Sequence, residues 1–197
     1  MCVTLNNMNL FEMTPEVLEG DSVELSFLEL KDSEELLFLV NSSREHLSRW
    51  FPWVESFLAL EDASASIDAY QMQREMANGG AFGIRRLEDG ALMGEVILQW
   101  VDRKNLSGSI GYFLGEEFIG NGYAREAVQL VVDYAFRKLG LHRLEISAAE
   151  ENAPSIALAL ALGFQKEGFF RDFEFLHGKF LSHCRFSLLS GDDRLRM

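Results

Sequence analysis

A glycine-bearing turn is the stretch of this sequence whose residues could most clearly do chemistry. Residues 107–114 alternate as a β-strand does, residues 119–124 spell Ile-Gly-Asn-Gly-Tyr-Ala, and a helical pattern follows them. Glycines let the backbone approach an anion closely, and the first amides of a helix have no acceptor within that helix. Such a turn can bind phosphate or pyrophosphate, although an ordinary turn has the same spelling.

Two phosphate-binding classes are excluded by the residues around this turn. A dinucleotide-binding fingerprint needs a third glycine where Arg125 stands. An NTPase loop needs Gly-Lys-Ser/Thr, whereas Gly122 is followed by Tyr123 and Ala124. The group that the turn would hold is therefore neither a nicotinamide dinucleotide nor an NTP.

No metal site, disulfide framework or membrane segment is predicted. Cys2 and Cys184 lie at opposite ends of the chain, which favours a reducing, cytoplasmic location. No group of His, Cys or carboxylate residues has the spacing of metal ligands. The N-terminus lacks the basic and apolar regions of a signal peptide. The most apolar run, residues 156–164, is about half the length that a membrane helix needs.

The composition is that of one folded domain with an acidic surface. The chain has 197 residues, of which 48% are hydrophobic and 25% charged, and its net charge is −13. Phosphate contacts require clustered Lys and Arg, so nucleic acid is not an expected partner. Residues 1–62 hold 13 acidic and three basic side chains, a net charge of 3 − 13 = −10. This excess suits either a solvated surface or a cationic partner.

Hydrophobic periodicity predicts a mixed α/β domain with a largely antiparallel sheet. Strands are expected over residues 21–30, 81–87, 91–101, 107–114, 142–148, 165–176 and 179–189, with the last two forming a hairpin around His177 and Gly178. Helices are expected from a cap at Asp32–Ser33, over residues 61–76 up to Gly79–Gly80, from Gly122 to Gly140, and from a cap at Asn152 to Gly163. Residues 1–20 are expected to form an irregular arm, residues 21–190 the domain, and residues 191–197 a tail.

Four spaced segments resemble the GNAT superfamily of acyl-CoA N-acyltransferases, and in particular its RimJ/RimL branch of ribosomal-protein N-terminal acetyltransferases. Residues 119–124 match the family pattern Gln/Arg-x-x-Gly-x-Gly/Ala at every position except Ile119. The other similar segments are Ile-Gly-Tyr-Phe-Leu at 110–114, Glu-Asn-Ala-Pro-Ser at 151–155 with Leu-Gly-Phe at 162–164 and Glu-Gly at 167–168, and Leu-His-Gly-Lys-Phe at 176–180. The resemblance runs from about Asp21 to Leu189.

The resemblance implies a fold and a co-substrate. The fold is a mostly antiparallel sheet that is splayed at two parallel strands, here 107–114 and 142–148, with helices on both faces. Acetyl-CoA would lie between these strands, its thioester carbonyl polarised by backbone amides near Phe113 and Leu114 and its pantetheine arm contacted by Asn152. The pyrophosphate would lie on the backbone amides of Ile119, Gly120, Asn121, Gly122, Tyr123 and Ala124. The apolar Ile119 would weaken one contact without abolishing function.

The resemblance also implies an acid and a base. Ser155 would protonate the departing thiolate, and Glu174 would receive the proton of the amine. A capping role for Ser155 and a plain surface role for Glu174 are the structural alternatives. Trp50 and Trp53 would wall the acceptor cleft, with core packing as the alternative. His142, His177 and His183 receive no catalytic role, and His177 is expected in a surface turn.

The acceptor class remains open in the sequence. The resemblance favours a protein N-terminal amine, in particular that of a ribosomal protein, over a small cationic amine such as a polyamine or an aminoglycoside. A non-catalytic acyl-CoA sensor would keep the glycine turn but would not need Ser155 and Glu174. The branch often forms dimers, so the resemblance implies that a homodimer can form, with the closing hairpin supplying an edge.

Overall fold

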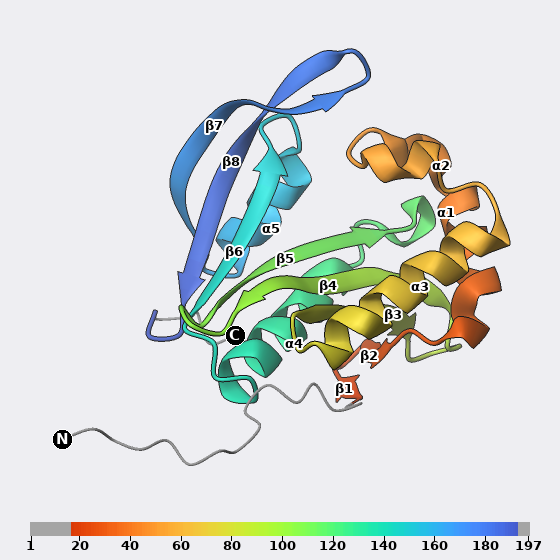
Figure 1. Ribbon diagram of the computed structural model, residues 1–197, viewed down its shortest axis with the longest axis horizontal. Coiled ribbons are helices and arrows are strands. Elements are labelled where there is room, and N and C mark those ends of the chain that lie inside the picture. Colours follow the sequence, from red (N-terminus) through yellow and green to blue (C-terminus); the bar gives the residue numbers. More distant parts are fainter. Residues whose placement is uncertain (1–16, 193–197) are drawn as a thin grey trace.

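An eight-stranded sheet in the order β1-β2-β3-β4-β5-β6-β8-β7 runs through the structure, a computed structural model that describes residues 17–192 (Figure 1). All neighbouring strands are antiparallel except β5 and β6. The strands are β1 (Leu18–Glu19), β2 (Val23–Phe27), β3 (Gly79–Arg86), β4 (Leu92–Asp102), β5 (Ser107–Leu114), β6 (Arg143–Ala149), β7 (Gln165–Leu176) and β8 (Lys179–Leu189). The predicted mixed fold with a mostly antiparallel sheet is confirmed.

Helices lie on both faces of this sheet (Figure 1). The α-helices are α1 (Ser33–Ser42), α2 (Arg44–Ser48), α3 (Leu60–Glu75), α4 (Tyr123–Arg137) and α5 (Ala153–Ala161), and the 3-10 helices are η1 (Leu30–Asp32), η2 (Pro52–Glu55) and η3 (Glu116–Phe118). Helix α4 fills the core because its apolar residues repeat at helical spacing. Val128, Val131 and Ala135 are completely buried, and Tyr134 packs edge-on against Phe82 of β3. This rigid centre fixes the start of α4, which carries the glycine turn.

Several boundaries differ from the sequence-based expectation because of contacts between strands. Helix α3 ends at Glu75, and Gly79 opens strand β3 instead of closing the helix. Gly79 has φ of +127°, and a Cβ there would lie 2.2 Å from the Leu98 carbonyl oxygen of β4, so a glycine is required by close strand pairing. Leu18 and Glu19, expected in an irregular arm, pair with β2. The rest of that arm up to residue 16, and residues 193–197 of the expected tail, lie outside the described residues.

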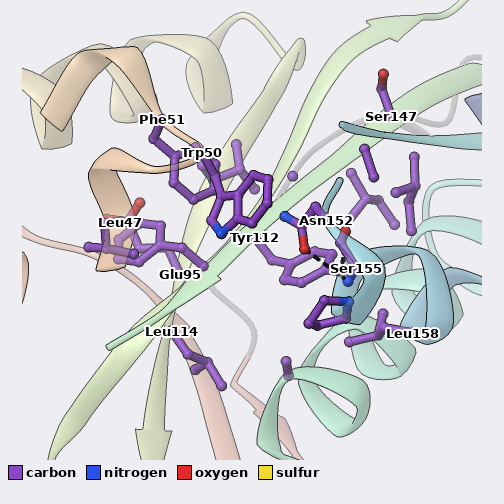
Figure 2. A pocket seen from close by; sticks show the side chains of 18 of the residues that line it. Leu47, Trp50, Phe51, Glu95, Tyr112, Leu114, Ser147, Asn152, Ser155 and Leu158 are labelled. Carbon is purple, nitrogen blue, oxygen red and sulfur yellow. Dashed lines mark hydrogen bonds between the residues drawn. The ribbon is translucent and has the colours of Figure 1, made fainter. Parts of the chain in front are cut away.

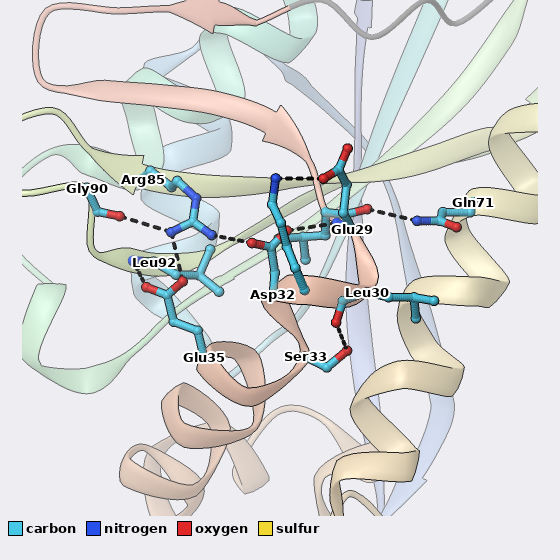
Figure 3. Close-up of polar contacts among 11 residues, drawn as sticks. Glu29, Leu30, Asp32, Ser33, Glu35, Gln71, Arg85, Gly90 and Leu92 are labelled. Atoms are coloured by element: carbon cyan, nitrogen blue, oxygen red, sulfur yellow. Dashed lines mark hydrogen bonds and ion pairs between the residues drawn. The ribbon is translucent and has the colours of Figure 1, made fainter.

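A polar network fastens α1 to the β3–β4 hairpin (Figure 3). Helix α1 begins at Ser33 as expected, but the Asp32 side chain does not cap it. One Asp32 oxygen accepts the Glu29 backbone N–H at 2.8 Å, and the other pairs with the Arg85 guanidinium at 2.8 Å. Arg85 also pairs with Glu35 at 2.8 Å, and Glu35 accepts the Leu92 N–H. The partly buried guanidinium therefore draws the Asp32 carboxylate away from the helix end.

The two halves of the sheet separate after a short parallel contact. Strands β5 and β6 pair only from Ser107 with Arg143 to Ser109 with Glu145. Beyond that point β5 continues beside β4, and β6 continues beside β8. The gap between the two halves is the splayed geometry expected from the sequence. Among residues 17–192, no helix is long and apolar enough to cross a membrane.

Candidate active site

A cavity of about 1170 Å³ occupies the gap between β5 and β6. It is lined from both halves of the sheet, by residues of α2, α3, β4 and β5 on one side and of β6, α5, β7 and β8 on the other. Figure 2 shows Trp50 reaching toward it from one side and Asn152 and Ser155 from the other. Every residue expected at the site lines this cavity except Asn121. The Asn121 side-chain amide instead donates to the carbonyls of Phe118 and Ile119 and braces the turn.

The glycine turn has the geometry of an anion cradle at the start of α4. Gly120 and Gly122 both have φ of +85°, a left-handed conformation that favours glycine. A Cβ on either would meet no protein atom within 4 Å, so the backbone borders open space. Gly122 is the residue immediately before the helix, and the first helical amides point out of the helix end. Ile119, 44% exposed, lies at this end of the cavity. The residues present therefore fit the pyrophosphate of acetyl-CoA.

The cavity-facing edge of β5 supplies backbone groups for an elongated ligand. Because pairing with β6 stops at Ser109, residues 110–114 have no strand partner on that side among the described residues. Phe113 and Leu114 lie at the end of this edge and line the cavity. Backbone N–H groups at such a position can bind the amides of a pantetheine arm and polarise a thioester carbonyl.

Two hydroxyl groups meet where β5 faces α5. The Tyr112 hydroxyl and Ser155 Oγ are 2.8 Å apart. The predicted cap at Asn152 is confirmed, because Asn152 Oδ1 accepts the Ser155 backbone N–H at 3.2 Å. Thus Asn152 serves as the cap, and the Ser155 hydroxyl is left for Tyr112 and the cavity. Burial raises the pKa of Tyr112, and the bond with Ser155 only partly opposes this, so the phenol keeps its proton at neutral pH.

Glu174 belongs to a chain of polar side chains and is not a plain surface carboxylate. Its Oε2 lies 3.2 Å from His183 Nε2, and His183 Nδ1 lies 3.1 Å from Ser147 Oγ. A carboxylate only accepts, so His183 Nε2–H donates to Glu174 and, in the neutral ring, Nδ1 accepts the Ser147 hydroxyl proton. His183 is buried, which fixes the ring. The carboxylate is therefore held at the cavity wall in one orientation.

A bulge in β7 creates this juxtaposition. Phe170 pairs with His183, but the next pair is Glu174 with Leu181, so β7 holds two extra residues there. Asp172, in the middle, has φ of +50° and donates its backbone N–H to the Ser182 hydroxyl. Bulges re-aim side chains next to functional sites. This one places Glu174 diagonally across from His183.

An aromatic wall closes the other side of the cavity. Trp53 contacts Phe57 and Phe113 at centroid distances of 5.3 and 5.6 Å, and Phe51 lies 6.1 Å from Phe113. Trp50 packs against a small cluster of buried residues from the opposite half of the sheet, Ala149, Leu176 and Leu181. Both tryptophans line the cavity, so each combines packing with a surface for a ligand.

The tip of the β7–β8 hairpin bridges the two halves above the cavity. His177, expected in a surface turn, is the turn residue with φ of +50°. It also reaches across the gap, since its Nε2 lies 2.7 Å from the Ser48 carbonyl oxygen at the end of α2 and its Nδ1 lies 3.3 Å from Glu55. This contact ties the hairpin to the aromatic wall.

Glu95 of β4 is a second cavity carboxylate that the sequence did not single out. It is 4% exposed, and its Oε1 has no hydrogen-bond partner among the described residues. Burial raises the pKa of Glu95 to about 8. Burial, and then the nearby charge of Glu95, raises the pKa of Tyr70 on α3. Within β4, Glu95 is preceded by Gly94 and followed by apolar residues, so its pattern is that of a buried strand.

The comparisons with known proteins agree with this geometry. The family model of the acetyltransferase (GNAT) domain matches residues 23–165. The "Probable N-acetyltransferase YjcK" of Bacillus subtilis strain 168 is 34% identical over 179 residues, which cover 90% of this chain and 99% of that protein. The ribosomal-protein-serine acetyltransferase of Escherichia coli strain K12 is 24% identical over 165 residues, covering 84% and 91%.

A solved structure with the same fold contains coenzyme A. RimL, a ribosomal L7/L12 alpha-N-protein acetyltransferase in complex with coenzyme A, matches with a TM-score of 0.85 at 20% identity, covering 90% of this chain and 100% of that one. The chain therefore belongs to the GNAT family of acetyltransferases, which transfer an acetyl group from acetyl-CoA to an amine.

Proposed function

We propose that the acceptor is the N-terminal amine of a protein, in particular of a ribosomal protein. The observation that carries this proposal is one continuous cavity that joins the glycine turn, the Ser155–Tyr112 pair, Glu174 and an aromatic wall. A peptide end can enter between the tryptophans and Glu174. The names of the ribosomal-protein-serine acetyltransferase and of RimL support a protein acceptor.

Glu174 and Ser155 are proposed as the base and the acid of a direct transfer. The ammonium loses a proton to Glu174, directly or through water, and the amine nitrogen attacks the thioester carbonyl carbon. Backbone N–H groups near Phe113 and Leu114 stabilise the oxyanion. The attacking nitrogen then gives its second proton to water as the carbon–sulfur bond breaks, and the thiolate takes a proton from the Ser155–Tyr112 hydroxyl pair. Solvent returns a proton to this hydroxyl pair and removes the proton held by Glu174 after the products leave.

His183 is proposed as a positioning residue for this base. It contacts Glu174 from β8, where it lines the same cavity, and its other nitrogen is held by Ser147. A carboxylate fixed by one hydrogen bond keeps its second oxygen, Oε1, for the incoming amine.

A small cationic amine is the second candidate acceptor, and Glu95 is the observation that favours it. A buried carboxylate without a partner is costly unless a ligand compensates it. Glu95 lines the same cavity as Glu174, so a compact amine can contact it there.

The test is thiol release from acetyl-CoA with a panel of acceptors. The panel contains peptides with free N-terminal Ser or Ala, the same peptides with a blocked N-terminus and an internal lysine, spermidine, and an aminoglycoside. We expect release with the free N-termini and a mass increase of one acetyl group at the α-amine. Turnover of only the small amines would select the second candidate, and turnover of blocked peptides would overturn N-terminal specificity.

We also propose that two copies of the chain pair through the closing hairpin in a cytoplasmic dimer. Strand β7 is the edge of the sheet. Exposed phenylalanines lie on it and on β8, namely Phe169, Phe170, Phe173, Phe175 and Phe180.

A further inference from the structure

Glu95 is the one strongly buried carboxylate in the cavity wall whose role the transfer reaction leaves unassigned. It forms no ion pair among the described residues, and Oε1 forms no hydrogen bond there. Taking a carboxylate out of water is unfavourable unless something pairs with it. A group that remains unpaired at a cavity wall is a candidate for contact with the ligand.

The pleat of β4 assigns Glu95 to the acceptor side of the cavity. Side chains alternate along a strand, so Glu95, Ile97 and Gln99 share one face. Glu95 lies opposite Phe113 on β5, which contacts the aromatic wall at Trp53. The next pair, Val96 with Tyr112, faces the other way, toward Ser155 on α5.

Helix α3 covers this acceptor side above Glu95. Asp62, Ser66 and Tyr70 of α3 line the same cavity, and Tyr70 is close enough for the charge of Glu95 to act on it. The Asp62 carboxylate is held at the start of α3, since Oδ2 accepts the backbone N–H groups of Leu58 and Ala59 at 2.9 Å. Glu95 differs from it because its Oε1 is buried and has no hydrogen-bond partner among the described residues.

We propose that Glu95 binds a second cationic group, an ammonium or a guanidinium, on the acceptor molecule. The proposal rests on the proposed amine acetylation and names its substrate class: amines that carry another positive charge several bonds away. Glu174 on β7 receives the proton of the reacting amine, and Glu95 on β4, in the other half of the sheet, holds the distant charge. A diamine or polyamine has this chemistry, and so does a peptide whose first residue is basic.

The surroundings suit such a ligand. Aromatic rings of Trp50, Phe51 and Trp53 cover an alkyl chain and attract a cation over their faces. The raised pKa of Glu95 means that the empty site binds a proton near neutral pH, and a bound cation would displace it. The acidic first third of the chain attracts the same kind of acceptor.

The experiment compares acceptors that differ only in the distant charge. Cadaverine is matched with n-pentylamine, and a peptide beginning with lysine is matched with one beginning with norleucine. Initial rates are measured with wild-type protein, with Glu95→Gln and with Glu88→Gln, a control that removes one charge at an exposed turn. The two pairs distinguish a free diamine from a peptide as the source of the charge.

We expect Glu95→Gln to raise KM for cadaverine, for the lysine peptide or for both by about tenfold or more, because a desolvated charge pair is lost. For the same variant, we expect KM for n-pentylamine, for the norleucine peptide and for acetyl-CoA to stay within about twofold of the wild-type values. We expect every KM of the control Glu88→Gln to stay within the same range. Equal KM values for charged and uncharged partners in the wild-type protein would overturn the proposal. So would a loss of kcat with every acceptor, which would make Glu95 part of proton transfer.

Calorimetry separates this inference from the proposed function. Cadaverine and the lysine peptide are titrated into the protein saturated with coenzyme A, for wild type and Glu95→Gln. Binding that Glu95→Gln abolishes supports the subsite even if no acceptor releases thiol, in which case only the proposed function fails. Binding that is equal in both proteins, or absent from both, overturns the subsite. Thermal unfolding of the variant confirms that it is folded.

Discussion

The carboxylate of Glu174 and the hydroxyl of Ser155 lie in different halves of the sheet and face one cavity. We predict that Glu174→Gln lowers kcat by about tenfold or more, because the amide cannot take the proton of the ammonium. The Kd of acetyl-CoA stays unchanged, since Glu174 lies on β7 and the glycine turn lies before α4, in the other half of the molecule. Steady-state rates measure kcat, and calorimetry measures the Kd of acetyl-CoA. Asp172→Asn, which removes an exposed carboxylate from the same strand, serves as the control. Wild-type turnover in Glu174→Gln would remove that residue from the mechanism.

The imidazole of His183 should act through Glu174. We predict that His183→Ala lowers kcat severalfold with little change in the KM of the acceptor, because the carboxylate loses the donor that orients it. His183→Gln should recover part of the loss, since its amide N–H₂ can donate to Glu174. Full rate-against-pH profiles are recorded for both variants. Equal losses in the two variants would mean that His183 supports the fold and not the base.

The buried Glu95 carboxyl should make stability depend on pH in a defined direction. Burial raises the pKa of Glu95 from its ordinary value of 4.5, which applies to the unfolded chain, to about 8 in the folded chain. Between pH 4.5 and pH 8 the unfolded chain has therefore released a proton that the folded chain retains. The free energy of unfolding therefore falls as pH rises, by up to about 1.4 kcal/mol per pH unit from this group. We predict that Glu95→Gln is more stable than wild type at pH 8 and that the difference disappears near pH 4.5. Urea unfolding at several pH values measures the difference in the free energy of unfolding between the two proteins. A difference that does not change with pH would contradict the prediction.

At the scale of elements, the turn before α4 can be tested with a matched pair of glycines. Gly122→Val forces a branched side chain into a left-handed conformation beside the cavity, whereas Gly90→Val does so in the exposed β3–β4 turn, with φ of +75°. Each should cost roughly 1–3 kcal/mol of stability. We predict that only Gly122→Val weakens acetyl-CoA binding by about tenfold or more, because its side chain enters the pyrophosphate cradle. Calorimetry measures the Kd of acetyl-CoA for both variants. Equal Kd values would mean that the pyrophosphate does not bind at this turn.

Sequence periodicity predicted those elements whose pattern is local. Strand β5 and both hairpin strands begin and end at the expected residues because alternation and flanking turn residues specify them. The cap at Asn152 could be predicted because it involves only the Asn152 side chain and the backbone N–H of Ser155, three residues later. Local rules failed at Asp32, whose carboxylate is drawn to Arg85, 53 residues away, and at Gly79, whose conformation depends on the backbone of β4.

The site residues also divide into those that a local motif identifies and those that only the folded structure brings together. Family motifs pointed to Ser155 and Glu174, but the neighbours of each come from other strands. Tyr112 meets Ser155 through the β5–α5 packing, and His183 meets Glu174 through a two-residue bulge that no alternation pattern reveals. Glu95 sits in a run of buried residues, and only the assembled cavity shows that its carboxylate has no partner.

At the scale of the whole molecule, the site exists only because two halves of one sheet part. The first half supplies the glycine turn, the aromatic wall and Glu95, and the second supplies Ser155, Glu174 and His183. Contact between His177 at the hairpin tip and Ser48 fixes the distance between the halves. The hairpin is therefore both a wall of the cavity and the outer edge of the sheet.

That outer edge leads to a prediction about assembly. An edge strand of 12 residues with exposed apolar side chains favours pairing with another chain. Phe175 and Phe180 lie side by side there, 61% exposed each, with ring centroids 5.0 Å apart. We predict that the wild-type chain sediments with twice the mass of one chain, and that Phe175→Lys with Phe180→Lys returns it to a monomer. Phe38→Lys, at a position on α1 that is 71% exposed, should leave the dimer intact. A monomeric wild-type chain at tens of micromolar would contradict the prediction, and a dimer that survives the double substitution would place the interface elsewhere.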